Sequence, residues 1–134
     1  MADGGETILV VEDYADLRDL IEEILRSAGY RVLMAPDGAA GLNLAREHDG
    51  EIDVLLTDIV MPNMLGPDLA DQLRSGTPGL RVLFMSGHAQ PALGTTTLAP
   101  GAVLLQKPFM ADELLAKLHE VLTAPAAGGV IGLG

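Results

Sequence analysis

Short runs of apolar, mostly branched side chains recur along the chain. There are five of them: Ile8 to Val11, Val32 to Met34, Val54 to Leu56, Val82 to Met85 and Val103 to Leu105. Within each run the apolar residues do not alternate with polar ones, which is typical of strands that are covered on both faces. The pattern therefore predicts five buried strands.

The segments between these runs have the spacing of amphipathic helices. The clearest repeats apolar side chains at i, i+3, i+4, i+7 and i+8 and ends at Gly29. Its apolar positions are Leu17, Leu20, Ile21, Ile24, Leu25 and Ala28. A second helix is expected to begin near Asp37 as its N-cap, and a third near Pro67. The last carries Leu114, Leu115, Leu118, Val121 and Leu122 on one stripe.

Two kinds of segment have weaker patterns. The connection from Gln90 to Pro100 is the poorest helix candidate, because Gly94 and three successive threonines have low helix propensity. Residues 1–6 and 123–134 are expected to be flexible, the latter because it is rich in alanine, glycine and proline. One domain is then expected over residues 7–122.

The alternation of strands and helices predicts an α/β fold with a doubly wound parallel sheet. Right-handed crossovers place helices on both faces of such a sheet. For five strand and helix units we expect the strand order 2-1-3-4-5. Ligands of these sheets bind beyond the carboxyl ends of the strands, at the switch point between strands 1 and 3.

The amino-acid composition limits the kind of core, the partners and the reactive groups that the chain can have. Hydrophobic residues make up 49% of the 134 residues and aromatic residues only 3%, so the core must be aliphatic. The net charge of -11, with eight basic residues, argues against binding to nucleic acid and favours a cationic partner or a metal ion. The absence of cysteine excludes disulfides and thiolate chemistry.

The start of the chain does not look like a targeting segment. Asp3 and Glu6 stand where a signal peptide would need positive charge, and no apolar run approaches the roughly 20 residues of a membrane span. We expect a cytoplasmic protein that makes no membrane contact through this domain.

Polar residues follow the predicted strands at the edge where ligands bind. Glu12 and Asp13 follow the first strand, Asp58 the third, Ser86 the fourth and Lys107 the fifth. Three carboxylates held together repel one another, and their oxygen ligands suit a hard cation such as Mg²⁺. A metal, an ammonium and a hydroxyl together can neutralise a transferring phosphoryl group.

Asp58 is the best candidate for the nucleophile, because its strand lies in the middle of the predicted sheet. Carboxylates of this kind form acyl phosphates. Taken alone, Asp13 could simply cap the first helix. Its place beside Glu12, together with Asp58 and Lys107, favours a role in metal binding instead.

Four segments carry a family resemblance: VVEDYADLRDLI, LLTDIVMPNMLGPDLA, FMSGHA and LLQKPF. They resemble, in order and spacing, the signature segments of response-regulator receiver domains of bacterial two-component signalling, a flavodoxin-like fold. The resemblance covers roughly residues 7–122. It implies an acceptor domain, not an enzyme in its own right, whose partner is a histidine kinase or a histidine phosphotransfer protein.

The resemblance also implies residue roles. Asp58 would be phosphorylated, and Mg²⁺ would be held by Asp13, Asp58 and the backbone carbonyl of Val60, with Glu12 binding metal-bound water. Ser86 and Lys107 would contact phosphoryl oxygens, and the bond between Lys107 and Pro108 would be cis.

One position departs from the family pattern. Leu104 stands three residues before Lys107, where the family often has an aromatic switch residue, so coupled aromatic rotation is not implied. The segments are also similar to receivers at the carboxyl end of hybrid histidine kinases, and a free-standing regulator is equally compatible with them. We expect a monomer or a weak dimer.

Two other functions use the same topology. A small Mg²⁺-dependent phosphohydrolase could form an aspartyl phosphate, but it should have a substrate pocket or an inserted cap, for which the chain is short. A flavin-binding electron carrier needs a loop rich in Ser, Thr and Gly after the first strand. The sequence there is the acidic EDYAD.

Overall fold

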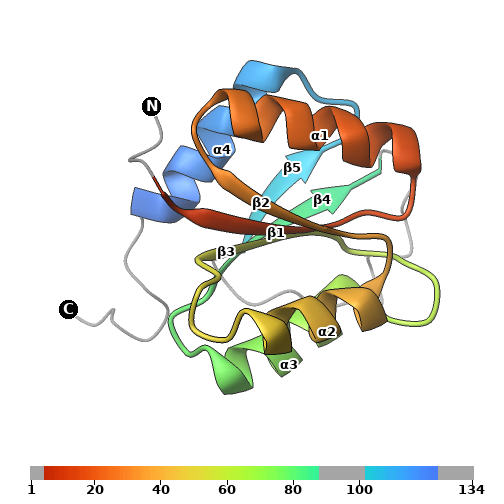
Figure 1. The fold of residues 1–134 in the computed structure, drawn as a ribbon. Helices are drawn as coiled ribbons and strands as arrows, with labels where there is room; N and C mark the ends of the chain where they lie inside the picture. The colour runs from red at the N-terminus through yellow and green to blue at the C-terminus, as the bar shows by residue number, and fades with distance from the viewer. Residues whose placement is uncertain (1–4, 88–101, 124–134) are drawn as a thin grey trace.

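The computed structural model describes residues 5–87 and 102–123 (Figure 1). Five strands form one parallel sheet in the order β2-β1-β3-β4-β5, as predicted. They are β1 (Thr7–Val11), β2 (Arg31–Ala35), β3 (Val54–Asp58), β4 (Arg81–Ser86) and β5 (Val103–Gln106). The expectations for 90–100 and for 124–134, and that for 1–4, lie outside the described residues.

The four helices of the described residues cover both faces of the sheet. They are α1 (Ala15–Ser27), α2 (Gly38–Glu47), α3 (Gly66–Gly76) and α4 (Ala111–Thr123). In Figure 1, α1 and α4 lie against one face and α2 and α3 against the other. The four predicted helices that fall in the described residues are therefore present.

Local chemistry explains where these helices begin and end. The Asp37 carboxylate caps α2 by accepting a hydrogen bond from the Ala40 amide at 2.8 Å. Pro67 lies in the first turn of α3, where its missing N–H is not needed. Gly29 has φ of 99°, a left-handed conformation that lets the chain turn from α1 into β2.

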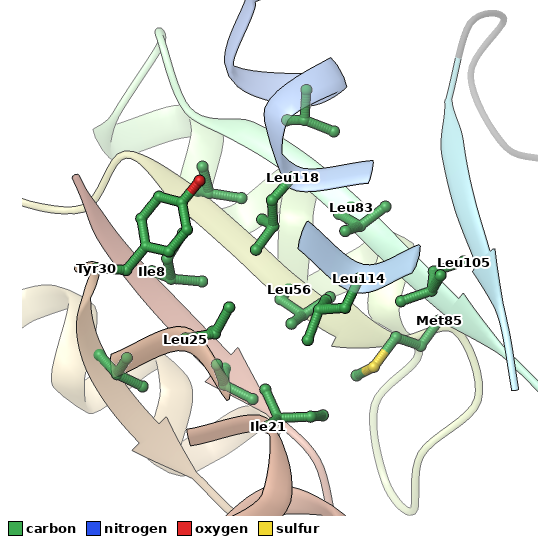
Figure 2. Packing of buried hydrophobic residues seen from close by; sticks show 14 residues of the cluster. Ile8, Ile21, Leu25, Tyr30, Leu56, Leu83, Met85, Leu105, Leu114 and Leu118 are labelled. Carbon is green, nitrogen blue, oxygen red and sulfur yellow. The ribbon is translucent and has the colours of Figure 1, made fainter. Parts of the chain in front are cut away.

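Two apolar layers hold the sheet between the helices. Alternate residues of β1 point to opposite layers, with Ile8 and Val10 on the side of α1 and α4 and Leu9 and Val11 on the side of α2 and α3. Figure 2 shows the first layer, which includes Ile8, Ile21, Leu25, Tyr30, Leu56, Leu83, Met85, Leu105, Leu114 and Leu118. The central strands are thus buried on both faces, as their sequences predict.

Within the part of the chain that the structure describes, none of the helices has the length and apolar character needed to cross a bilayer.

Candidate functional site

The carboxyl ends of the strands bring the predicted polar residues to one edge of the sheet. Asp58 is the last residue of β3, and its register partner on β4 is Met85, one residue before Ser86. Ser86 in turn pairs with Gln106, which precedes Lys107. These positions are adjacent across neighbouring strands because the sheet is parallel.

Glu12 is fixed by contacts on both its backbone and its side chain. Its amide donates a hydrogen bond to the Ala35 carbonyl at 3.1 Å, which extends the pairing of β1 with β2 by one residue. Its Oε2 accepts from the Tyr14 amide at 2.9 Å, and its Oε1 accepts from Lys107 Nζ at 2.8 Å. The residue is only 1% exposed, so these donors replace water around a buried charge.

Lys107 connects the two buried carboxylates. Its Nζ lies 2.6 Å from Asp58 Oδ1 as well as 2.8 Å from Glu12 Oε1. Asp58 is 5% exposed, and among the described residues its Oδ2 has no hydrogen-bond partner. One ammonium thus serves two acids, and one buried acceptor oxygen is left over for a ligand.

The two acids respond differently to this shared cation. Burial, reinforced by the charge of Glu12, raises the pKa of Asp58 from 3.8 to about 7, although Lys107 acts to lower it. Burial also acts to raise the pKa of Glu12, but hydrogen bonds from Lys107 and the Tyr14 amide outweigh it and the pKa is lowered.

Lys107 remains charged in this environment. Burial acts to lower the pKa of its ammonium, but hydrogen bonds with Asp58 and Glu12 outweigh that effect and raise the pKa. The site therefore contains a firmly ionised Glu12 and a firmly charged lysine, with Asp58 as the acid that gains or loses a proton near neutrality.

The donor set fits a small hard cation. Glu12, Asp13 and Asp58 each offer a carboxylate oxygen, and these oxygens lie within 4.8 Å of one another. Asp13 is exposed and does not cap the first helix, because the N-cap position of α1 is Tyr14 and has no side-chain cap. Asp58 Oδ2, which has no hydrogen-bond partner among the described residues, could also be satisfied by a cation at this position.

Ser86 ends the strand beside Asp58, Val60 follows Asp58 in the chain, and the roles of both residues stay predictions. Ser86 is 8% exposed and its hydroxyl donates to the Gly87 carbonyl at 3.3 Å, while its own carbonyl accepts from the Lys107 amide at 2.8 Å. Val60 lies two residues after Asp58 and is 43% exposed. The peptide between Lys107 and Pro108 is cis, as expected.

The loop after β3 is packed closely around Asp58. Met61 is buried, and its sulfur accepts a hydrogen bond from the Thr57 hydroxyl at 3.6 Å. The Gly66 amide donates to the Ile59 carbonyl at 2.7 Å. A Cβ atom at Gly66 would overlap the backbone carbonyl oxygen of Asp58, so only glycine allows α3 to begin this close to the site.

Sequence reasoning missed two groups that support the site. The Tyr14 amide donates to Glu12 Oε2, and the Arg18 guanidinium donates through Nη1 to the Glu12 carbonyl at 2.8 Å. The only signal for Arg18 was its place one helical turn after Tyr14, which puts it in the first turn of α1. Spacing alone does not reveal which acceptor such a long side chain reaches.

Comparison with known proteins agrees with this geometry. The model of the response regulator receiver domain family matches residues 8–119. The chain belongs to this family. The match includes every residue of the candidate site, from Glu12 to Lys107.

Individual relatives of this receiver domain differ in length. It is 36% identical to the response regulator receiver protein CpdR of Brucella abortus, over 87% of this chain and 97% of CpdR. It is also 36% identical to the sensor kinase CckA of the same organism, over 89% of this chain but only 13% of the kinase. The chemotaxis protein CheY4 of Vibrio cholerae superposes with a TM-score of 0.77 at 30% identity, covering 89% of this chain and 100% of CheY4.

Proposed function

We propose that this receiver domain is the phosphoacceptor of a two-component phosphorelay and that Asp58 takes the phosphoryl group. The observation that carries the proposal is the buried Asp58 carboxylate. Lys107 Nζ lies 2.6 Å from one of its oxygens, and the other oxygen, beside Glu12 and Asp13, has no hydrogen-bond partner in the described part of the chain. The partner would be a histidine kinase or a histidine phosphotransfer protein. The domain would act as an acceptor and not as an enzyme with a separate substrate.

Transfer of a phosphoryl group to Asp58 would be a single displacement at phosphorus. A carboxylate oxygen of Asp58 forms a bond to phosphorus while the bond from phosphorus to the donor imidazole nitrogen breaks, and the imidazole keeps the electron pair. Lys107, whose ammonium pairs with both acids, would neutralise charge on the phosphoryl oxygens once the ammonium leaves Glu12. Ser86, at the end of the neighbouring strand, would donate its hydroxyl to another phosphoryl oxygen.

Mg²⁺ fits the carboxylate cluster. Asp13 and Asp58 would hold it together with the carbonyl of Val60, and Glu12 would bind water on the ion. The ion would neutralise the three acids and the incoming phosphoryl oxygens, which would otherwise repel one another. Its charge would also favour the ionised form of Asp58, whose pKa burial raises to about 7.

The test is intact mass after incubation with acetyl phosphate and Mg²⁺. The wild-type chain should gain about 80 Da, the mass of one phosphoryl group, and chelation of Mg²⁺ should abolish the gain. Asp58→Asn should not gain mass. Asp71→Asn is the matched control, because Asp71 is an exposed aspartate on α3, and it should behave as wild type.

Other results would contradict the proposal. An equal gain in Asp58→Asn would place the modification elsewhere. A wild-type chain that stays unmodified with both acetyl phosphate and a phosphorylated histidine phosphotransfer protein would exclude the acceptor function. Rapid release of inorganic phosphate with many turnovers and no stable adduct would favour the alternative, a small phosphohydrolase.

Phosphorylation would act by shifting a conformational equilibrium toward a form with different protein contacts. Leu104 occupies the position of the usual aromatic switch, and its side chain is aliphatic. It lies on β5 beside its register partner Phe84 of β4 and is 39% exposed. The relatives include both a receiver of similar length and a long sensor kinase, and either arrangement suits this domain.

A further inference from the structure

The peptide that joins Glu12 to Asp13 is held by a side chain from α1. Its carbonyl oxygen accepts a hydrogen bond from Arg18 Nη1 at 2.8 Å, a charge-assisted bond in a partly buried position. The backbone of Arg18 is itself fixed, because its amide donates a hydrogen bond to the Tyr14 carbonyl at 2.9 Å in the first turn of α1. The guanidinium therefore reaches back from a helix to the end of a strand.

This carbonyl lies at the point where the chain leaves the sheet after β1. The Glu12 amide still pairs with Ala35, and the Glu12 side chain is held by Tyr14 and Lys107. Asp13 is different, because it is exposed and lies beyond the pairing of β1 with β2. The orientation of the Asp13 side chain thus depends on the peptide plane that Arg18 fixes.

We propose that Arg18 is a positioning residue for the cation site: by holding the Glu12 carbonyl it directs the Asp13 carboxylate toward Glu12 and Asp58. This inference rests on the proposed function. Groups that orient metal ligands without touching the metal commonly contribute about 10- to 100-fold to affinity. Arg18 meets that description, since its partner is the backbone of the ligand loop and not a carboxylate.

The same helix contains a matched control. Arg26 also donates to a backbone carbonyl, that of Val32 at 3.2 Å, and pairs with Glu22. It lies in the last turn of α1, away from the carboxylate cluster. Loss of its guanidinium removes the same kind of bond without touching the ligand loop.

The experiment measures Mg²⁺ binding by calorimetry in wild type, Arg18→Met, Arg18→Lys and Arg26→Met, with urea unfolding of each chain in chelator. We expect Arg18→Met to bind Mg²⁺ about 10-fold or more weakly, and Arg26→Met to bind as wild type. Arg18→Lys keeps the positive charge and a donor group but loses the planar guanidinium, and it should give an intermediate affinity. In the Mg²⁺-free Arg18→Met chain, the backbone amide resonance of Asp13 should shift, because that amide belongs to the peptide that Arg18 holds.

Three results would overturn the inference, and they differ in what they imply for the proposed function. If Arg18→Met binds Mg²⁺ as tightly as Arg26→Met, Arg18 has no positioning role, while the proposed function stands. If the wild-type chain itself binds no Mg²⁺, both the inference and the proposed function are wrong. Should Arg18→Met fold poorly in the urea series, Arg18→Gln, which also lacks the charge, replaces it. Wild-type affinity in the folded Arg18→Gln chain together with an unshifted Asp13 resonance would also overturn the inference.

Discussion

Replacement of Asp58 by asparagine should stabilise the Mg²⁺-free protein. The carboxylate is 5% exposed, and burial raises its pKa from 3.8 to about 7. At 1.36 kcal/mol per pKa unit, this rise corresponds to an upper limit of about 4 kcal/mol for keeping the ionised acid in the folded state. The asparagine amide must still be buried, and its hydrogen bond with Lys107 is weaker than the ion pair of the aspartate. We therefore expect the free energy of unfolding to rise by only about 1–3 kcal/mol.

The sign of the pH dependence follows from the direction of the shift. Between pH 3.8 and about 7 the folded protein binds a proton at Asp58 that the unfolded chain has released. The Mg²⁺-free wild type should therefore lose stability as pH rises through this window and should stay at its lower value above it. The loss due to Asp58 should be missing in Asp58→Asn.

Urea unfolding followed by far-ultraviolet circular dichroism, in chelator and over a pH series, measures both effects. A change of about 2 kcal/mol moves the urea midpoint by about 1 M for a domain of this size. Asp71→Asn removes an exposed acid and is the control. An Asp58→Asn chain that is less stable than wild type at about pH 8, or that has the same pH slope, would refute the reasoning. Mg²⁺ should stabilise wild type and narrow the difference.

Three further substitutions probe the site and the core. Gly66→Ala should destabilise the fold by about 1–3 kcal/mol and weaken Mg²⁺ binding, because its Cβ would overlap the Asp58 carbonyl oxygen. Gly76→Ala, with nothing within 4 Å of its Cβ, should do neither, and equal effects in urea titrations would contradict the packing argument. Lys107→Met should lower the free energy of unfolding by about 2 kcal/mol near neutral pH, since it leaves two buried acids without their shared cation. It should also slow phosphoryl uptake in the mass assay, and wild-type stability and uptake would count against the bridging role. Leu118→Ala should lower the free energy of unfolding by about 2–5 kcal/mol, because this side chain of α4 is fully buried in the apolar layer between α4 and the sheet. A smaller loss in urea titrations would mean that the neighbouring side chains collapse into the space it leaves.

The positions of the strands along the chain were predictable because burial on both faces leaves a strong mark on a sequence. Continuous apolar runs such as Val54 to Leu56 are typical of strands that helices cover on both sides. The ends of these strands were less predictable. β3 continues through Thr57 to Asp58, two polar residues, because the backbone still pairs there with Phe84 and Met85 of β4. Backbone hydrogen bonds do not depend on side-chain polarity, so composition underestimates strand length.

The candidate site was predictable as a set of residues but not as a set of contacts. Parallel strands must bring their carboxyl ends together, which places Glu12, Asp58 and Lys107 at one edge whatever their rotamers. That Lys107 bridges the two acids depends on side-chain conformations that no periodicity encodes. The same holds for Arg18, whose role is visible only once its guanidinium is seen against the Glu12 carbonyl.

A change at Asp58 has a short physical route to the end of the neighbouring strand. Lys107 is bound at its side chain by Asp58 and Glu12 and at its amide by the carbonyl of Ser86. A cation at Asp58 would compete with the Lys107 ammonium for the two acids, and a phosphoryl group would compete with Glu12 for that ammonium. In either case Lys107 cannot keep both partners unchanged. Because the Lys107 backbone is tied to Ser86, any rearrangement of its side chain acts next to the last residues of β4. The carboxyl end of β4, at Ser86, therefore lies directly beside such a change.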